Sequence, residues 1–318
     1  MNTQPKVALG TWSWSVTEEG QNGGNEVFGN HLTQADLKPV FDAGMKAGLT
    51  LWDTAYVYGM GQSETIVGNL LKEYDRETVI LSTKFTPQFR NRDAREPVRE
   101  MLEKSFQNLG VDTVDIYWIH NPSHFEEWVQ GLIPLAKEGK IRKMGVSNHN
   151  LSQIKRAEEI LEAEGLKLSC VQNHYSLLYR SSEFGGILDY CKEKGMDFFA
   201  YMSLEQGALS GKYDRNNLMP EDSQRGKFYN PLLPAMNPLL VTMKEIGAAH
   251  DATAAEVAIA YTIAKGALPL VGVTKVEQVL QAKKASEIDF TPAEIQTLEK
   301  MAESTGVDAK GYWEKPMA

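Results

Sequence analysis

The sequence predicts an α/β fold in which eight parallel strands, each followed by a helix, close into a (β/α)8 TIM barrel. Short apolar runs alternate with longer amphipathic runs along the chain, which indicates repeated strand–helix units. The length of 318 residues, of which 42% are hydrophobic, suits one barrel domain over residues 1–318. No G-x-G-x-x-G motif follows an early strand, which argues against an open doubly wound sheet.

The predicted strands are short runs, three to six residues long, and most of them offer a polar or ionisable side chain at or just after their carboxyl end. In chain order they cover residues 8–10, 50–53, 79–83, 114–119, 141–146, 169–172, 197–201 and 268–271. Their alternation with helical patterns favours parallel pairing, because a parallel neighbour needs a crossover connection.

The predicted helices fill the intervals between the strands. Thr33 begins the first, with Asp36 at capping-box spacing, and Gly48 ends it. The other helices of the barrel are expected at 63–74, 95–109, 125–137, 151–164 and 184–194. Extra helices are expected at 236–250 and 254–265, after the seventh strand, and at 292–305, near the C-terminus. Residues 22–30 are rich in Gly and Asn and are expected to form a loop.

Charge and composition exclude several classes of partner. The formal net charge of −9 repels phosphate backbones, so no nucleic-acid partner is expected. Residues 1–7 do not resemble a signal peptide and no apolar run reaches the length of a membrane span, so no membrane partner is expected. Only two cysteines are present, Cys170 and Cys191, which favours packed thiols and a cytoplasmic location.

Four residues near strand ends form a coherent chemical set, because chemistry in such barrels collects where strands end. Reduction of a carbonyl needs a proton for its oxygen, and Tyr58 can donate one. The ammonium of Lys84 would lower the pKa of Tyr58, and Asp53 would keep Lys84 charged. His120 would hydrogen-bond the substrate oxygen and fix its position.

A metal-dependent barrel hydrolase is a competing hypothesis for the same strand ends. It would use Asp53, His120, His174 and Asp189 as metal ligands. No H-x-H or H-E-x-x-H spacing supports it, so we expect no metal. His174 is expected to be a rim or packing histidine.

The motifs around these residues resemble those of the aldo-keto reductase family from about residue 9 to residue 285. They are Leu9-Gly10-Thr11-Trp12, Asp53-Thr54-Ala55-x-x-Tyr58-Gly59, Gly61-x-Ser63-Glu64, the run ending in Lys84, the run ending in His120, Gly145-Val146-Ser147-Asn148 and Val171-Gln172-Asn173-x-Tyr175-Ser176. The resemblance implies a nicotinamide cofactor bound at the carboxyl-end rim. It implies NADP(H), with NAD(H) as the alternative, and a small-molecule carbonyl or alcohol as substrate.

The resemblance also implies which residues hold the cofactor. Ser147, Asn148 and Gln172 match the positions that bind the nicotinamide carboxamide, and Tyr201 matches the aromatic residue that stacks on its ring. The remaining cofactor positions are Thr11, Trp12, Ser203, Leu204, Gln206, Gly207, Leu209 and Lys212, and, toward the adenosine end, Gly272, Thr274, Lys275, Gln278 and Gln281.

Two residues depart from the family pattern. Glu205 puts a negative charge in the loop expected to cover the phosphates, and we expect it to point to solvent. Gln281-Ala282 stands where the family usually has Glu-Asn, so adenine binding is expected to be looser or to depend on Gln278. Lys275 and Thr274 are expected to contact the 2′-phosphate of NADPH.

The substrate pocket is expected to be apolar and bounded by three loops. Trp12 and Trp14 would form its wall beside Tyr58 and His120. The loops 17–30, 121–125 and 225–233 would form its rim and contribute Phe28, His124, Phe125, Phe228 and Tyr229.

A regulatory nicotinamide-binding subunit is the main alternative to an enzyme. Potassium-channel β subunits resemble these reductases and keep the same Asp, Tyr, Lys and His set, so the four residues alone do not separate the two functions. The sequence leaves the oligomeric state and the physiological substrate open.

Overall fold

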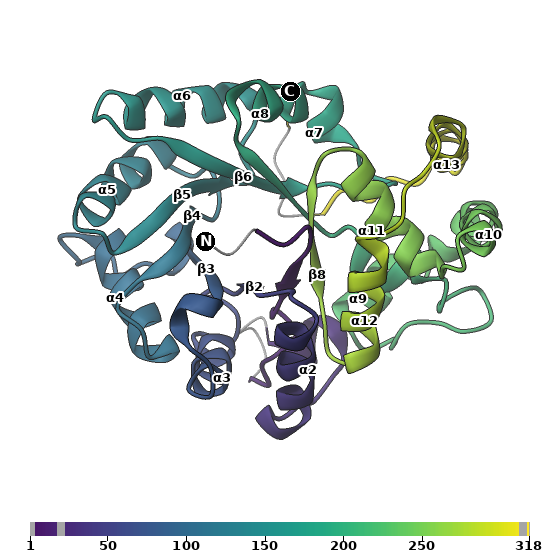
Figure 1. The fold of residues 1–318 in the computed structure, drawn as a ribbon, viewed down its shortest axis with the longest axis horizontal. Helices are drawn as coiled ribbons and strands as arrows, with labels where there is room; N and C mark the ends of the chain where they lie inside the picture. Colours follow the sequence, from purple (N-terminus) through teal and green to yellow (C-terminus); the bar gives the residue numbers. More distant parts are fainter. Residues whose placement is uncertain (1–3, 18–22, 312–316, 318) are drawn as a thin grey trace.

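The computed structural model describes residues 4–17, 23–311 and 317. Its eight strands form a closed barrel in which every neighbouring pair is parallel and β8 pairs with β1 (Figure 1). The strands are β1 (Ala8–Gly10), β2 (Leu51–Asp53), β3 (Ile80–Phe85), β4 (Val114–Ile119), β5 (Ile141–Ser147), β6 (Leu168–His174), β7 (Asp197–Tyr201) and β8 (Leu268–Gly272). The predicted barrel is therefore confirmed.

Helices surround the barrel, and extra helices are present at the positions that the sequence predicts. Those near predicted ranges are α2 (Gln34–Lys46), α3 (Gln62–Leu71), α4 (Pro97–Leu109), α5 (Phe125–Lys137), α6 (Leu151–Glu162) and α8 (Ile187–Lys194). The predicted extra helices are α10 (Leu233–Ala249), α11 (Ala254–Ala264) and α13 (Pro292–Ser304). The capping box of Thr33 and Asp36 is present at the start of α2.

Three observed helices were not predicted, namely α1 (Gly24–Phe28), α7 (Ser181–Phe184) and α9 (Gln224–Tyr229), whereas α12 (Val276–Ala285) follows β8 where the barrel predicts a helix. The expected loop at 22–30 contains α1, so that prediction was wrong for 24–28, and Asn22 lies outside the described residues. Helix α1 has five residues and no side-chain cap, but it packs against α9, where Gln224 Nε2 donates to Glu26 Oε1 at 2.8 Å. Tertiary contacts thus stabilise a segment whose local sequence does not favour a helix.

Side-chain alternation along the strands produces two apolar cores. The smaller core fills the barrel and consists of Ala8, Leu51, Ile116, Trp118, Cys170 and Phe199. The larger core lies between the sheet and the helices, and it receives Tyr117 and Ile119, the neighbours of Trp118. Because successive side chains point to opposite faces, the residues at the strand ends are directed either into the barrel mouth or toward the helices.

A network of charges connects α13 to the barrel. Arg180 Nε lies 2.8 Å from Glu183 Oε2 in α7, and Arg180 Nη2 lies 3.2 Å from Glu299 Oε1 in α13. Lys265, the residue after α11, lies 2.7 Å from Glu183 and 2.8 Å from Glu299. Glu183 therefore shares its carboxylate between two cations that also contact α13. Burial alone would raise the pKa of Glu183, but hydrogen bonds from Arg180 and Lys265 lower it to about 2.

We expect Glu183→Gln to reduce the free energy of unfolding by about 1–2 kcal/mol near neutral pH. The pKa of Glu183 is lower in the folded state than in the unfolded state. Its contribution to the free energy of unfolding is therefore present above the ordinary pKa of 4.5 and is lost as the pH falls toward about 2. Urea unfolding from about pH 7 to about pH 3.5 should show the difference from wild type shrinking as the pH falls. The matched control is Glu303→Gln, whose carboxylate is 66% exposed. Equal losses at the two positions, or a loss independent of pH, would contradict the assignment.

Candidate active site

A buried ammonium connects the ends of two strands to the tyrosine hydroxyl. Lys84 on β3 and Asp53 on β2 are almost fully buried. Lys84 Nζ donates to Asp53 Oδ1 at 2.5 Å, to the backbone oxygen of Thr54 at 2.8 Å and to Tyr58 Oη at 3.1 Å. All three ammonium hydrogens therefore have an acceptor, and one of those acceptors is the predicted proton donor.

The second oxygen of Asp53 is anchored to the inside of the barrel. Ser82 Oγ donates to Asp53 Oδ2 at 2.6 Å, and Trp118 Nε1 donates to Ser82 Oγ at 2.6 Å. Gln172 Nε2 lies 3.3 Å from the same carboxylate oxygen. Hydrogen bonds from β3 and β6 thus hold the carboxylate in one orientation, as a buried charge requires, and Trp118 on β4 holds Ser82 in place.

Two opposing effects set the pKa of Tyr58. Burial raises the pKa of the phenol above its ordinary value, while the charge of Lys84 lowers it, and burial is the larger effect. The expectation that Lys84 lowers the pKa is correct in direction, but the net shift in the protein alone is upward. Burial would lower the pKa of Lys84, but its interactions with Asp53 and Tyr58 raise this pKa by more. The net pKa of Lys84 lies above the ordinary value for lysine, so the side chain stays charged. Tyr58 therefore stays protonated at neutral pH beside a fixed cation.

His120 follows β4 and lies against the same tyrosine. The two ring centroids are 6.2 Å apart with an interplanar angle of 77°. Asn148 Nδ2 donates to the backbone oxygen of His120 at 2.9 Å, and Tyr201 Oη donates to Asn148 Oδ1 at 2.5 Å. Burial and the nearby charge of Lys84 hold the pKa of His120 well below its usual range, so the imidazole is neutral at pH 7.

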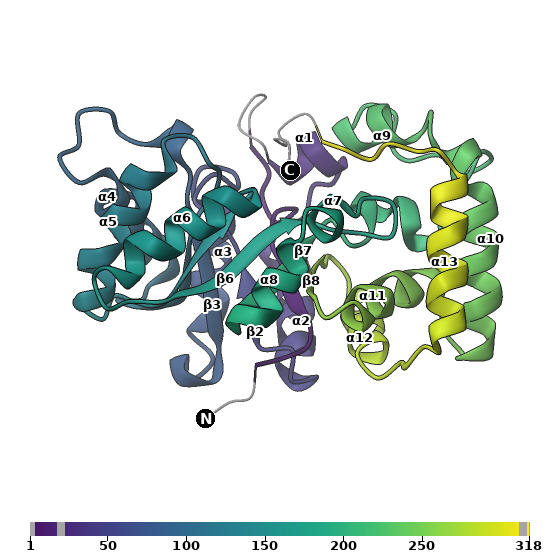
Figure 2. The ribbon, with the colours of Figure 1, turned by 90° about the horizontal axis from the view of Figure 1, so that it is seen from above.

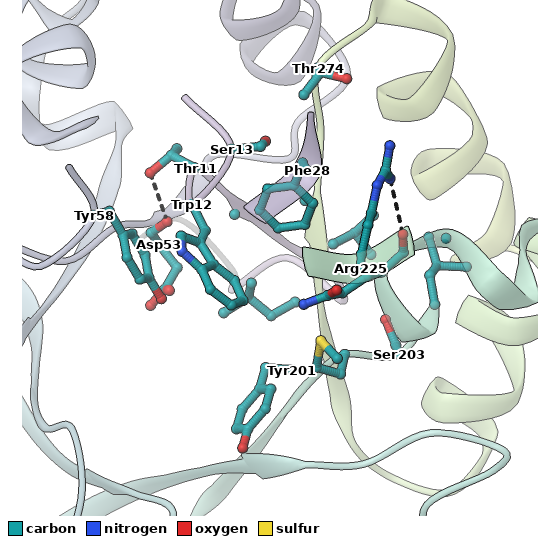
Figure 3. A pocket seen from close by; sticks show the side chains of 18 of the residues that line it. Thr11, Trp12, Ser13, Phe28, Asp53, Tyr58, Tyr201, Ser203, Arg225 and Thr274 are labelled. Atoms are coloured by element: carbon teal, nitrogen blue, oxygen red, sulfur yellow. Dashed lines mark hydrogen bonds between the residues drawn. The ribbon is translucent and has the colours of Figure 1, made fainter. Parts of the chain in front are cut away.

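One cavity of about 1690 Å³ at the carboxyl-end rim brings most of the predicted residues together. Three of the four residues predicted to be catalytic line it: Asp53, Tyr58 and His120. It is also lined by Thr11, Trp12, Ser147, Gln172, Tyr201, Ser203, Leu204, Gln206, Gly207, Lys212, Gly272, Thr274, Lys275, Gln278 and Gln281. Figure 3 shows Trp12 and Tyr58 on one side of this space and Tyr201 on another.

Four predicted site residues do not line the cavity: Lys84, which lies behind Tyr58, and three others. Trp14 is fully buried behind it, where its Nε1 donates to the backbone oxygen of Val273 at 2.6 Å, so its expected place in the pocket wall was wrong. Leu209 is fully buried in the outer core. Asn148 acts behind the lining by joining Tyr201 to His120.

The three predicted rim loops contribute to the cavity only in part. Its lining includes Phe28, Gly29 and Asn30 from the first loop, Asn121, Pro122 and Ser123 from the second and Arg225 from the third. Residues 18–22 lie outside the described residues. The expected aromatic residues His124, Phe125, Phe228 and Tyr229 do not line the cavity.

Glu205 is completely buried, so the expectation that it points to solvent was wrong. Its Oε1 lies 2.8 Å from His174 Nε2 and also accepts a hydrogen bond from Ser176 Oγ, and its Oε2 accepts one from Tyr229 Oη at 2.6 Å. His174 is the expected packing histidine, because it is buried and stacks behind Tyr201 with ring centroids 5.6 Å apart. The negative charge therefore lies beneath the loop, where it has partners of its own.

The adenosine-end segment is held by Gln278. Its Oε1 accepts hydrogen bonds from the backbone nitrogens of Thr274 at 2.6 Å and Lys275 at 3.1 Å. The carboxamide oxygen of Gln278 is thus used to shape the turn before α12. Gln281, one helical turn farther along, also lines the cavity.

The sequence did not single out Arg225, although it begins one of the predicted rim loops. Arg225 Nη1 donates to the backbone oxygen of Gln206 at 3.1 Å, and its guanidinium lies 5.8 Å from the ring centroid of Phe28. Figure 3 shows the two side chains projecting into the same space, and Figure 2 shows α1 and α9 at the end of the barrel opposite the N-terminus. The signal in the sequence was a lone arginine in a Gly- and Ser-containing loop, which is too weak to interpret.

Among residues 4–17, 23–311 and 317, no three His, Cys, Asp or Glu side chains come together as potential ligands of a metal ion. Within the same described residues, no helix combines the length and the apolar character that crossing a membrane requires.

Known proteins provide a consistent comparison. Residues 6–303 match the Aldo/keto reductase family. The chain is 30% identical over 312 residues to an aldo-keto reductase of Strobilurus tenacellus, covering 94% of this chain and 90% of that protein. It is 29% identical over 327 residues to the NADH-specific methylglyoxal reductase of Escherichia coli, covering 95% and 96% of the two chains.

Solved structures have the same fold. The glycerol dehydrogenase of Gluconobacter oxydans superposes with a TM-score of 0.79 at 26% identity, covering 95% of this chain and 92% of that one. An aldo-keto reductase from Klebsiella pneumoniae, solved in complex with NADPH, superposes with a TM-score of 0.72 at 24% identity, covering 94% and 91%. On the match over residues 6–303, the chain belongs to the aldo/keto reductase family of oxidoreductases.

Proposed function

We propose that the protein reduces an aldehyde or ketone to an alcohol, with NADPH as the hydride donor and Tyr58 as the proton donor. The observation that carries this proposal is the Tyr58 hydroxyl at the cavity surface, 3.1 Å from the buried Lys84 ammonium and next to a neutral His120. The proposed substrate is a small carbonyl compound of unassigned identity.

The cavity suits a nicotinamide nucleotide because two buried polar atoms of its lining are left without partners among the described residues. Ser203 Oγ and Arg225 Nε are buried and have no hydrogen-bond partner in the described part of the chain. Three cations, Lys212, Arg225 and Lys275, line the cavity of a chain whose net charge is −9. Buried donors and local positive charge are what a diphosphate requires. The Klebsiella pneumoniae relative was solved with NADPH, which also supports this cofactor.

We assign the holding of the nicotinamide to Ser147, Gln172 and Tyr201, which line one region of the cavity. The stack of Tyr201 on His174 supports a flat platform for the ring, and Asn148 fixes the tilt of Tyr201 from its hydroxyl end. When bound there, the reduced nicotinamide supplies the hydride.

The side chains near Tyr58 supply the proton and the orientation. Tyr58 donates its proton to the carbonyl oxygen as negative charge develops there, and the Lys84 ammonium stabilises the phenolate that remains. Asp53 keeps the ammonium in place, because its carboxylate is fixed by Ser82 and Gln172. The neutral His120 donates a second hydrogen bond to the same oxygen and so aligns the carbonyl carbon.

We propose a preference for NADPH, with Lys275 as the contact to the 2′-phosphate. Lys275 is exposed and lines the adenosine end of the cavity, where Thr274 adds a hydroxyl. The Escherichia coli relative, 29% identical to this chain, is named as an NADH-specific methylglyoxal reductase. Membership of the family therefore does not decide between NADPH and NADH. A lysine gives a point charge and not a bidentate fork, so the preference should be modest.

We propose a cytoplasmic location because both cysteines are free thiols. Cys170 and Cys191 are both buried and free. Burial raises the pKa of each thiol, that of Cys191 to about 12, so neither is a reactive thiolate at neutral pH. These are packed thiols of the kind expected in a reducing compartment.

We expect Tyr58→Phe to lower kcat for carbonyl reduction by about 10²–10⁴-fold and to leave NADPH affinity nearly unchanged, because only the proton donor is lost. NADPH oxidation over a panel of aldehydes and ketones gives kcat, and fluorescence titration gives Kd. Tyr56→Phe is the matched control, since Tyr56 does not line the cavity. A Tyr58→Phe enzyme that keeps more than about a tenth of wild-type kcat would remove Tyr58 from this role. A wild-type protein that binds NADPH but reduces none of the carbonyls would favour the regulatory alternative.

We expect His120→Ala to lower kcat/KM about 10- to 100-fold while the Kd for NADPH stays within about twofold of wild type, because His120 contacts the substrate oxygen. His250→Ala is the control, because His250 pairs with Glu294 and does not line the cavity. The neutral state of His120 also predicts that kcat/KM shows no inflection near pH 6.5, the ordinary pKa of histidine. Loss of cofactor affinity in His120→Ala would instead place His120 in the cofactor site.

We expect Lys275→Ala to raise KM for NADPH about three- to tenfold and to change KM for NADH little, since only NADPH carries the 2′-phosphate. Steady-state kinetics with both cofactors at a saturating carbonyl concentration tests this. Lys283→Ala in the same helix, where Lys283 pairs with Glu287, is the control for a change in surface charge. Equal effects on the two cofactors would show that Lys275 does not read the phosphate.

A further inference from the structure

Thr86 lies one period beyond Lys84 along the direction of β3. Side chains alternate along a strand, so Phe85 points into the outer core while Lys84 and Thr86 face the barrel mouth. The backbone nitrogen of His120 donates to the oxygen of Phe85 at 2.9 Å, which continues the β3–β4 pairing past the ends of the strands. This pairing brings the Thr86 hydroxyl to His120.

Thr86 and His120 share a short hydrogen bond. Thr86 Oγ1 lies 2.7 Å from His120 Nδ1, and the Thr86 side chain is buried. For Nε2, the other nitrogen of the ring, the described residues provide no hydrogen-bond partner, and His120 lines the cavity. One ring nitrogen is therefore held by the protein and the other is available to a ligand.

The chemistry of the ligand decides which nitrogen carries the proton. A neutral imidazole has one N–H donor and one acceptor nitrogen. A carbonyl oxygen only accepts hydrogen bonds, so the nitrogen that faces it must carry the hydrogen. If Nε2 is the donor, Nδ1 is the acceptor, and the Thr86 hydroxyl must donate to it. The opposite tautomer would direct a lone pair of Nε2 at the lone pairs of the carbonyl oxygen.

We infer that Thr86 is a positioning residue for carbonyl reduction: its hydroxyl donates to His120 Nδ1, fixes the Nε2–H tautomer and holds the ring so that Nε2–H faces the substrate oxygen. This inference rests on the proposed function. It gives β3 two linked roles, because Lys84 serves the proton donor and Thr86, two residues later, serves the histidine that orients the substrate.

The inference predicts different outcomes for two substitutions of Thr86. Thr86→Val keeps the shape of the side chain but leaves Nδ1 without a donor, so kcat/KM should fall about tenfold with an unchanged Kd for NADPH. Thr86→Ser restores the hydroxyl and should bring kcat/KM back to within about threefold of wild type. A Thr86→Val enzyme with wild-type kcat/KM would overturn the inference.

Nitrogen-15 NMR of histidine-labelled protein without cofactor tests the tautomer directly. The sequence has six histidines, and His120→Ala identifies the His120 signals by their loss. The wild-type and Thr86→Ser proteins should show an Nε2–H tautomer with Nδ1 as acceptor, whereas Thr86→Val should show a mixture of tautomers or the Nδ1–H form. An Nδ1–H tautomer in the wild-type protein would reverse the direction of the hydrogen bond and overturn the inference.

A matched control separates positioning from a loss of stability. Thr83, on the opposite face of β3, donates from Oγ1 to the buried Glu64 at 2.6 Å. Thr83→Val should lower the free energy of unfolding but leave the His120 tautomer and kcat/KM close to wild type. If Thr83→Val reduced kcat/KM as much as Thr86→Val, both effects would be structural. A wild-type protein that reduces no carbonyl would contradict the proposed function, while the NMR result would still test the bond from Thr86.

Discussion

The buried ion pair of Lys84 and Asp53 is the interaction on which the rest of the site depends. Removing two charges from water is costly, so such a pair persists only if its remaining hydrogen-bonding groups also find partners. Here the partners are Tyr58 and the backbone of Thr54 for the ammonium, and Ser82 and Gln172 for the carboxylate. Because they come from the loop after β2, from β3 and from β6, the pair is fully satisfied only when strands distant in the sequence have come together.

Hydrogen bonds from buried partners also fix the other polar side chains of the site, although the loops around them differ from the predictions. Tyr58, His120 and Tyr201 are each held from behind, by Lys84, by Thr86 and Asn148, and by Asn148 and the stacked His174. Their supports belong to strands or to residues directly after strands. The cofactor half has a similar arrangement, since Glu205 connects the loop after β7 to α9 through Tyr229.

Strand-end reasoning succeeded where local pattern determines position. All eight strands were found, and three of the four residues proposed to be catalytic line one cavity with Lys84 directly behind them. It failed where contacts with residues distant in the sequence determine the position of a side chain or a helix. Trp12 and Trp14 share an alternating spacing, but the chain turns after β1 and buries Trp14 against Val273. Nothing near Glu205 indicates His174 or Tyr229, 31 and 24 residues away, and α1 forms only because α9 packs on it.

Closure of the barrel by β1 and β8 has a consequence for synthesis of the chain. Leu9 pairs with Val271, so Thr11 and Trp12 can line one cavity with Thr274 and Lys275 only after the chain has been synthesised past β8. A nascent chain that extends past His120 but not to β8 already contains Asp53, Tyr58, Lys84 and His120. Because it lacks β8, its β1 has an open edge. Such a chain cannot complete the cofactor groove. Assembly of the cavity therefore depends on a contact between β1 and β8, which are far apart in the sequence, so it is a late event in folding.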